Sequence, residues 1–225
     1  SLFKKFFLWM VDYVIVPGSL HRNFIKSLSF NKKIFITRSV GIIKPVSKKK
    51  FSSKKKKIKI VYIGRVSREK NLELLFNLIK TSRNLSLSIY GRDEEKLEAK
   101  LNNFIKNRIK FKGSILNKKI ISEIKKYDLL ILPSKFEPWG LVIEEAIYNG
   151  VPVIVSNKVG CNRDLISTLK VGFVFKSNSL ESLKKCIDKI KNPGNLKKIN
   201  KNLSSLDYNS FKKKHINIYE NMMRK

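Results

Sequence analysis

Short apolar runs alternate with amphipathic segments along most of the chain. Between residues 58 and 193, runs typical of buried strands begin near Ile58, Leu85, Ile109, Leu129, Val153 and Gly172. The segments between them carry apolar residues at helical spacing. Strands and helices that alternate in this way form a parallel sheet with helices on both faces. The pattern therefore predicts an α/β fold with a doubly wound parallel sheet.

Further elements are predicted at both ends of the chain. The first part predicts a helix over 3–11, a strand over 13–16, a helix over 19–28 and a strand over 34–37. The last part predicts a helix over 179–190, a turn over 192–195 and a final helix over 207–223. For 225 residues, one domain plus a partial second one is the expected arrangement.

One segment combines a strand, an acidic loop and a helix start that is open to ligands. A predicted strand over 129–132 is followed by a loop that carries Glu137, and a helix is predicted over 141–148 before Gly150 stops it. The first-turn N–H groups of such a helix point outward and can bind an anion. A glycine at position 140 lets a ligand approach the backbone closely.

Two carboxylates flank this helix start, at Glu137 and Glu145. They can accept hydrogen bonds from hydroxyl groups on either side of a diphosphate bound to the amides of Gly140, Leu141 and Val142. A ligand with hydroxyls, phosphates and again hydroxyls is a nucleotide-sugar. The segment therefore predicts a nucleotide-sugar site.

A second segment places positive charge just after a strand. A buried strand over 58–63 ends at Gly64, and Arg65 and Lys70 follow on a turn before a helix predicted over 71–79. Arginine can hold a diphosphate as a bidentate fork and lysine as a point charge. In a chain so rich in lysine, the context of strand, glycine and arginine singles out this pair, rather than charge alone.

At these residues the chain resembles the retaining family 4 glycosyltransferases of the GT-B fold, whose C-terminal domain carries two glutamates separated by seven residues. Glu137 and Glu145 have that spacing. The resemblance implies that Glu137 meets the hydroxyls of the donor sugar and that Glu145 meets the ribose. It also implies that the amides of Gly140, Leu141 and Val142 hold the phosphates.

The resemblance gives the basic residues a catalytic role as well. It implies that Gly64, Arg65 and Lys70 bracket the diphosphate, which gains negative charge as the glycosidic bond breaks. Asn71 stands where the family usually has glycine, and asparagine also tolerates a left-handed backbone. Arg65, Lys70 and Glu137 are therefore the predicted catalytic residues.

Three further residues near these motifs are less distinctive. Gly91 and Gly113 match glycines that end strands near the nucleotide base in the family, but ordinary turns would also explain them. Gly113 is retained as a donor-binding residue. Glu144 is given no role, because a glutamate on a helix usually belongs to a solvated face.

The resemblance implies a division of the chain into four parts. They are a remnant of the N-terminal acceptor domain over 1–44, a basic linker over 45–57, a nucleotide-sugar-binding Rossmann-like domain over 58–195, and a helical segment over 196–225 that packs back on the remnant. His21 and His215 do not match the catalytic histidine that the family places in its N-terminal domain, and packing or surface roles are expected for both. We expect this chain alone to bind a nucleotide-sugar but to turn over slowly or not at all.

The strongly positive net charge of the chain indicates anionic partners in addition to the nucleotide-sugar. The chain has 49 basic and 17 acidic residues, a net charge of +32, with the densest lysine blocks at 48–50 and 54–57. An anionic membrane surface would add about 1 kcal/mol for each nearby basic residue. A coding sequence rich in A and T would produce the same excess of Lys, Asn and Ile without any partner. Nucleic acid is disfavoured, because aromatic residues such as Phe51 are too sparse among the lysines to stack bases.

Composition excludes several classes of protein. No apolar run approaches the 18 or more residues of a membrane-spanning helix, and 42% hydrophobic residues argue against disorder. Cys161 and Cys186 have no metal or redox spacing, so free thiols in a reducing cytoplasm are expected. No metal or cofactor is predicted. The predicted location is the cytoplasm, with peripheral contact at the inner face of the membrane as an option.

The predicted function is transfer of a hexose, with retention, from a nucleoside-diphosphate sugar to a glycan or lipid-linked acceptor. One alternative is an inactive remnant that binds nucleotide-sugars, and another is a basic module for nucleic acid or membrane surfaces. A sugar-nucleotide epimerase would need catalytic carboxylates and a histidine at positions that this chain does not offer.

Overall fold

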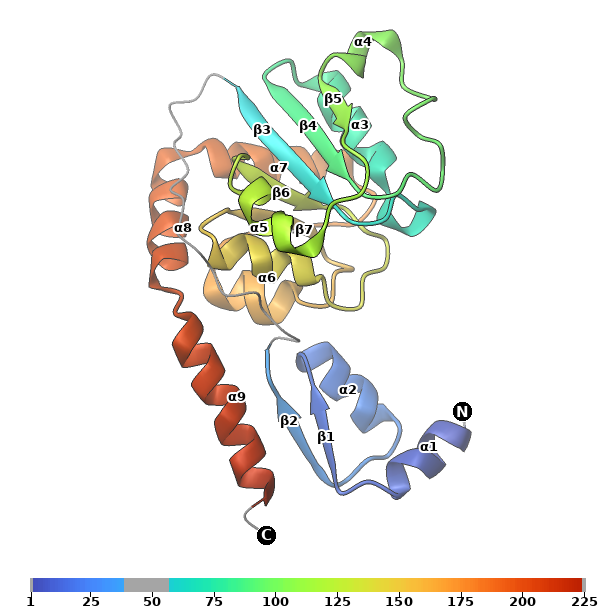
Figure 1. Ribbon diagram of the computed structural model, residues 1–225, viewed down its shortest axis with the longest axis vertical. Helices are drawn as coiled ribbons and strands as arrows, with labels where there is room; N and C mark the ends of the chain where they lie inside the picture. Colours follow the sequence, from blue (N-terminus) through green and yellow to red (C-terminus); the bar gives the residue numbers. More distant parts are fainter. Residues whose placement is uncertain (1, 39–56, 224–225) are drawn as a thin grey trace.

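The computed structural model describes residues 2–38 and 57–223, and Figure 1 shows their arrangement. Six parallel strands form the central sheet: β3 (Ile58–Ile63), β4 (Leu85–Tyr90), β5 (Ile109–Phe111), β6 (Leu129–Leu132), β7 (Val153–Ser156) and β8 (Gly172–Phe175). Their order is β5-β4-β3-β6-β7-β8. The predicted doubly wound parallel sheet is confirmed.

The strands form this sheet because their apolar residues can be buried on both faces. Every residue of β6 and β7 is buried, and β3 is buried at all positions except Lys59. Strands that are covered on both sides have such continuous apolar runs instead of an alternating pattern. The central position of β3 and β6 places the most apolar strands in the middle of the core.

Helices cover both faces of the sheet (Figure 1). They are α3 (Leu72–Thr81), α4 (Asn103–Lys106), α5 (Asn117–Ile124), α6 (Leu141–Tyr148), α7 (Leu180–Lys191) and α8 (Pro193–Ser205), with a 3₁₀ turn η1 (Arg68–Lys70) and a π-helical turn η2 (Asn162–Ser167). The chain moves outward from β3 through β4 to β5 and then in the opposite direction from β6 to β8. Right-handed crossovers therefore place α3 and α6 on opposite faces.

The predicted turn over 192–195 is wrong, because helix α8 begins inside it. Pro193 occupies the first helical position, and the side chain of Asn192 caps the helix by accepting a hydrogen bond from the N–H of Asn195 at 3.1 Å. Leu196 and Ile199 then bury their side chains in the core. The predicted domain boundary after residue 195 consequently lies within α8.

A smaller unit lies beside the carboxyl ends of the strands. This N-terminal unit, residues 2–38, consists of α1 (Leu2–Trp9), β1 (Tyr13–Val16), α2 (Ser19–Ser27) and β2 (Lys33–Ile36), with β1 and β2 paired in parallel. The last helix, α9 (Tyr208–Met223), extends from the sheet domain, residues 57–206, toward this unit (Figure 1). Its packing on the unit stays a prediction.

The predicted helices and strands lie within two residues of the observed bounds. Of the predicted linker over 45–57, only Lys57 belongs to the described residues. In the parts of the chain that the structure describes, no helix has both the length and the apolar character needed to cross a membrane.

Candidate functional site

The two motifs found in the sequence leave neighbouring strands. Gly64, Arg65 and Lys70 follow β3, and Glu137 follows β6, which pairs with β3 at the centre of the sheet. The direction of chain progression reverses between these two strands. In open α/β sheets, ligands bind at the carboxyl ends of the strands at such a reversal. The topology therefore brings both motifs to the place where this fold binds ligands.

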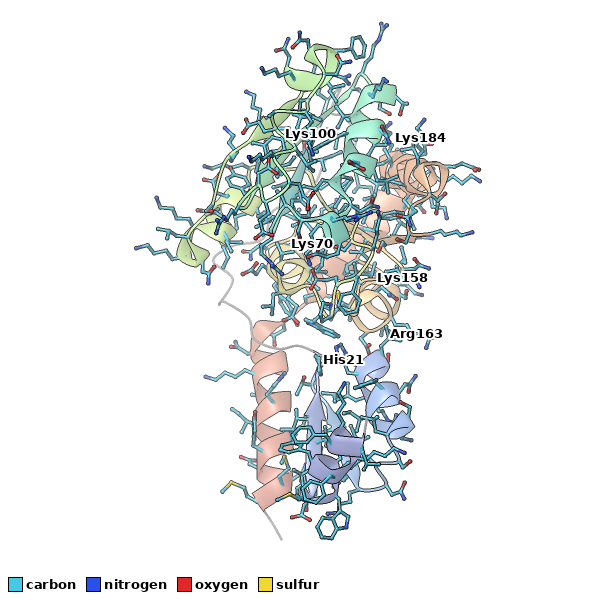
Figure 2. All side chains as sticks on the ribbon, turned by 90° about the vertical axis from the view of Figure 1, so that its right-hand side faces the viewer. His21, Lys70, Lys100, Lys158, Arg163 and Lys184 are labelled. Atoms are coloured by element: carbon cyan, nitrogen blue, oxygen red, sulfur yellow. The ribbon has the colours of Figure 1, made fainter. Side chains whose placement is uncertain are left out.

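A partly buried ion pair joins the two motifs. The Lys70 Nζ atom lies 3.0 Å from Oε2 of Glu137, and the two side chains are only 12% and 19% exposed. Partly buried charges are screened by salt much less than exposed ones. Figure 2 shows Lys70 in the half of the sheet domain that is nearer to the N-terminal unit. Two predicted catalytic residues that are 67 positions apart in the sequence are thus in direct contact.

Backbone hydrogen bonds hold the loop of Glu137 to the turn of Lys70 and to the turn after β7. The N–H of Lys135 donates a hydrogen bond of 2.7 Å to the carbonyl of Glu69, which joins the loop after β6 to the η1 turn. The N–H of Glu137 donates to the carbonyl of Lys158 at 3.2 Å, and the N–H of Gly160 donates to the carbonyl of Glu137 at 2.8 Å. The acidic loop is therefore held between the turns that follow β3 and β7.

Asn71 has the left-handed conformation that the family's glycine would adopt. Its φ is +57° and its ψ is +42°, and it connects η1 to α3. The side-chain amide of Asn71 donates to the carbonyl of Pro133 at 3.3 Å and to Oδ1 of Asn178 at 3.2 Å. The side chain of Asn71 thus ties this left-handed turn to the loop after β6.

Arg65 differs from Lys70 in its exposure. Its guanidinium is 67% exposed and lies 4.0 Å from Glu69. The Arg65 carbonyl is fixed by the hydroxyl of Tyr62, which donates to it at 2.6 Å. Burial, with the charges of Glu137 and Glu69 nearby, raises the pKa of Tyr62, so the hydroxyl remains a donor at neutral pH. The Arg65 backbone is therefore anchored while its side chain extends into solvent.

Three glycines meet at the ends of β3, β4 and β5. The N–H of Gly91 donates to the carbonyl of Gly113 at 2.8 Å, and a Cβ added to Gly91 would lie 1.8 Å from the carbonyl oxygen of Gly64. Gly113 has a φ of +65° and open space around its Cα. Gly113 therefore lies next to Gly91 at the end of β4, one strand away from β3, and its role in donor binding stays a prediction.

The start of α6 lies in a buried part of the loop, because Gly140 is itself buried, and its contact with a ligand stays a prediction. Gly140 is the N-cap residue with a φ of +95°, and no side chain caps the helix. Leu141 is 51% exposed and Val142 is partly buried. Further along α6, Glu145 is partly buried, and burial raises the pKa of its carboxyl group. The structure brings Glu137 directly onto Lys70, whereas Glu145 lies farther along the helix.

Family comparison agrees with this arrangement. Residues 43–205 match the model of the family described as glycosyl transferases group 1, which is more than half of the chain. The chain belongs to this family. It is 31% identical over 216 residues to an uncharacterized glycosyltransferase of Methanocaldococcus jannaschii, and the match covers 88% of this chain and 53% of that protein. The group 1 domain seen here thus spans about half the length of that curated relative.

Solved structures show the same fold at low sequence identity. The sucrose-phosphate synthase of Thermosynechococcus elongatus superposes with a TM-score of 0.79 and 18% identity, over 98% of this chain and 61% of that chain. TarM of Staphylococcus aureus, solved with UDP and α-GlcNAc-glycerol, gives a TM-score of 0.73 and 20% identity over 97% and 46%. These likenesses establish the Rossmann-like half of a GT-B glycosyltransferase fold.

Glu144, to which no role was assigned, does not lie on the solvated face that is usual for a glutamate on a helix. Glu144 is fully buried, and its Oε1 accepts a hydrogen bond from the indole N–H of Trp139. A buried tryptophan needs such an acceptor, and a buried carboxylate needs a donor. The lone tryptophan inside the motif was the signal in the sequence that pointed to a buried partner. Asp164 was missed as well, because its contact is with the distant Ser19.

The two histidines of the chain have the packing and surface positions that were expected. His21 is partly buried, and its ring packs against Trp139 at the junction of the two parts of the chain. His215 lies on α9 and is partly exposed. Among the described residues, no group of three or more His, Cys, Asp or Glu side chains is arranged to hold a metal ion.

Both cysteines are buried free thiols. Burial raises the pKa of Cys161 and of Cys186, so the reactive thiolate is disfavoured at neutral pH. We expect the native protein to show no reaction with Ellman's reagent, followed by reaction of both thiols once urea unfolds the chain. Rapid modification of either thiol in the native protein would contradict the buried positions.

Proposed function

We propose that this chain is the donor-binding part of a retaining family 4 glycosyltransferase. It transfers a hexose from a nucleoside-diphosphate sugar to a glycan or lipid-linked acceptor. The observation that carries the proposal is the partly buried pair of Lys70 and Glu137 at the point where chain progression reverses. The start of α6 in the same loop region, which has glycine at its N-cap and no side-chain cap, supports it.

Lys70 has donors to spare for the diphosphate. An ammonium group has three N–H donors, and the contact with Glu137 uses one of them. The others can bind phosphate oxygens, while the remaining lone pairs of Glu137 accept hydroxyl groups of the donor sugar. The positive charge of Lys70 compensates the carboxylate of Glu137, so that this carboxylate can lie next to the sugar without repelling the diphosphate.

Arg65 supplies the second positive charge. Its exposed guanidinium has only a 4.0 Å contact with Glu69 to break before it can bind a phosphate. As the glycosidic bond breaks, the leaving diphosphate gains charge, and fixed cations stabilise that charge most in the transition state. The leaving phosphate takes the proton of the acceptor, so that no side-chain base is needed in this proposal.

Glu145 binds the ribose in this proposal. Its carboxyl group is partly buried and has lost part of its hydration, and this burial raises its pKa. Two ribose hydroxyls can donate to the carboxylate and replace the hydrogen bonds that it lost on burial. The unfavourable free energy of burying Glu145, which is already present in the folded protein, is thereby reduced when the ligand binds, and binding is favoured. The presence of UDP in the TarM complex supports a uridine diphosphate donor as the first to test.

Thermal-shift measurements with UDP-, GDP- and ADP-glucose test the proposal. A ligand at 100 times its dissociation constant stabilises the folded state by about 2.7 kcal/mol. We expect one of the three to raise the melting temperature and Glu145→Gln to abolish that rise, because the amide replaces one of the two accepting oxygens by an NH2 group, which only donates.

A matched control uses a charge outside the site. Lys185→Ala removes an exposed ion pair with Glu181 on α7 and should leave the ligand-induced shift unchanged. If none of the three nucleotide-sugars stabilises the protein, or if Glu145→Gln keeps the full shift, the proposed donor site is wrong.

A further inference from the structure

The loop that carries Glu137 also forms the contact between the sheet domain and the N-terminal unit. Trp139 is 5% exposed, and its ring lies edge-on against the ring of His21 with centroids 6.0 Å apart. A Cβ added to Gly18 would lie 2.5 Å from a ring carbon of Trp139. Figure 2 shows His21 at this junction. The indole therefore cannot move without disturbing the start of α2.

A second contact fixes the position of α2 against the sheet domain. Oδ2 of the buried Asp164 accepts hydrogen bonds from both the N–H and the Oγ–H of Ser19, each 2.8 Å long. A carboxylate is favoured at a helix N-terminus by the free amides and by the helix dipole. The first turn of α2 is thus bound at one place, next to the indole ring.

The loop itself couples this ring to the donor site. The N–H of Gly160 donates to the carbonyl of Glu137, and the N–H of Cys161 donates to the carbonyl of Trp139 at 3.2 Å. On its other side, the indole N–H donates to the buried Glu144. Because the backbone of residues 137–139 and the ring of Trp139 are both held by these contacts, a displacement of the ring should move the whole segment, including Glu137.

We propose that Trp139 is a positioning residue that holds Glu137, and through it Lys70, in the donor-binding arrangement only while α2 is seated against the indole ring. The inference rests on the proposed function, because it concerns how that donor site is assembled. It predicts a coupling free energy between the seating of the N-terminal unit and donor binding. Trp139 acts through Glu137 and needs no contact with the donor.

A double-mutant cycle on donor affinity tests the coupling. Isothermal titration would use whichever of UDP-, GDP- and ADP-glucose binds the unmodified protein most tightly. His21→Ala removes the ring contact without touching the donor site and should weaken binding about fivefold. In a Glu137→Ala background the same change should alter affinity by less than about 1.5-fold, because the side chain through which Trp139 affects donor binding is absent. Lys26→Ala, an exposed change on the same helix, is the matched control and should have no effect.

A spectroscopic signal gives an independent result. The chain has two tryptophans, so Trp9→Phe leaves Trp139 as the only indole. Donor binding should shift the emission of Trp139, and His21→Ala should reduce the shift. Equal affinity losses in both backgrounds, or an emission unchanged by bound donor, would overturn the role of Trp139 while leaving the donor site intact. Failure of all three sugars to bind would instead refute the proposed function.

Discussion

Replacing Lys70 by methionine should remove nucleotide-sugar binding and also destabilise the protein. The substitution leaves Glu137 as an unpaired charge that is 19% exposed. Removal of one partner from a fully buried pair costs about 3–5 kcal/mol, and the residual exposure here lowers the expected cost to about 2–3 kcal/mol. Urea unfolding would measure that loss, and isothermal titration with the preferred nucleotide-sugar would measure the loss of binding.

The double variant Lys70→Met/Glu137→Gln separates stability from function. With both charges removed, most of the lost stability should return, because replacement of a whole buried pair by neutral groups is often close to neutral. Donor binding should stay absent, because the diphosphate has still lost its cation. Recovery of donor binding in the double variant would show that Lys70 serves only to neutralise Glu137.

Much of the fold could be predicted because local patterns determine it. The strands β6 and β7 are buried at every position, and such continuous apolar runs are visible in the sequence. The left-handed backbone at Asn71 also followed from the residue type. The turn prediction over 192–195 failed because the same Asn-Pro pair can cap a helix, and the burial of Leu196 decides between the two outcomes.

The predicted site was less complete, because its decisive contacts are distant in the sequence. The motifs indicated Lys70 and Glu137 separately, but only the pairing of β3 with β6 brings them together. The burial of Glu144 depends on the position of Trp139, five residues earlier, and the role of Asp164 depends on Ser19, 145 residues away. Trp139 indicates that a buried acceptor is needed, but the sequence pattern does not identify that acceptor, and it gives no sign of the contact between Asp164 and Ser19.

Gly91→Ala should strongly destabilise the sheet domain. The new Cβ would lie 1.8 Å from the carbonyl oxygen of Gly64, and the φ of +144° is unfavourable for any residue with a side chain. Backbone cannot yield as a flexible side chain can, so the ends of β3 and β4 must separate. We expect a loss of at least about 3 kcal/mol and a melting temperature about 6–12 °C lower.

The same displacement should reach the donor site. Gly64 is followed directly by Arg65, whose carbonyl accepts a hydrogen bond from the hydroxyl of Tyr62. Movement of Gly64 therefore shifts the backbone of Arg65, which is proposed to bind the diphosphate. Nucleotide-sugar affinity should therefore fall as well, measured below the melting transition. Gly113→Ala is the matched control: its φ of +65° costs about 1 kcal/mol in left-handed strain, but the new Cβ would meet no atom within 4 Å. If both variants lose the same stability, the close approach of Gly91 to Gly64 is not what fixes the position of Arg65.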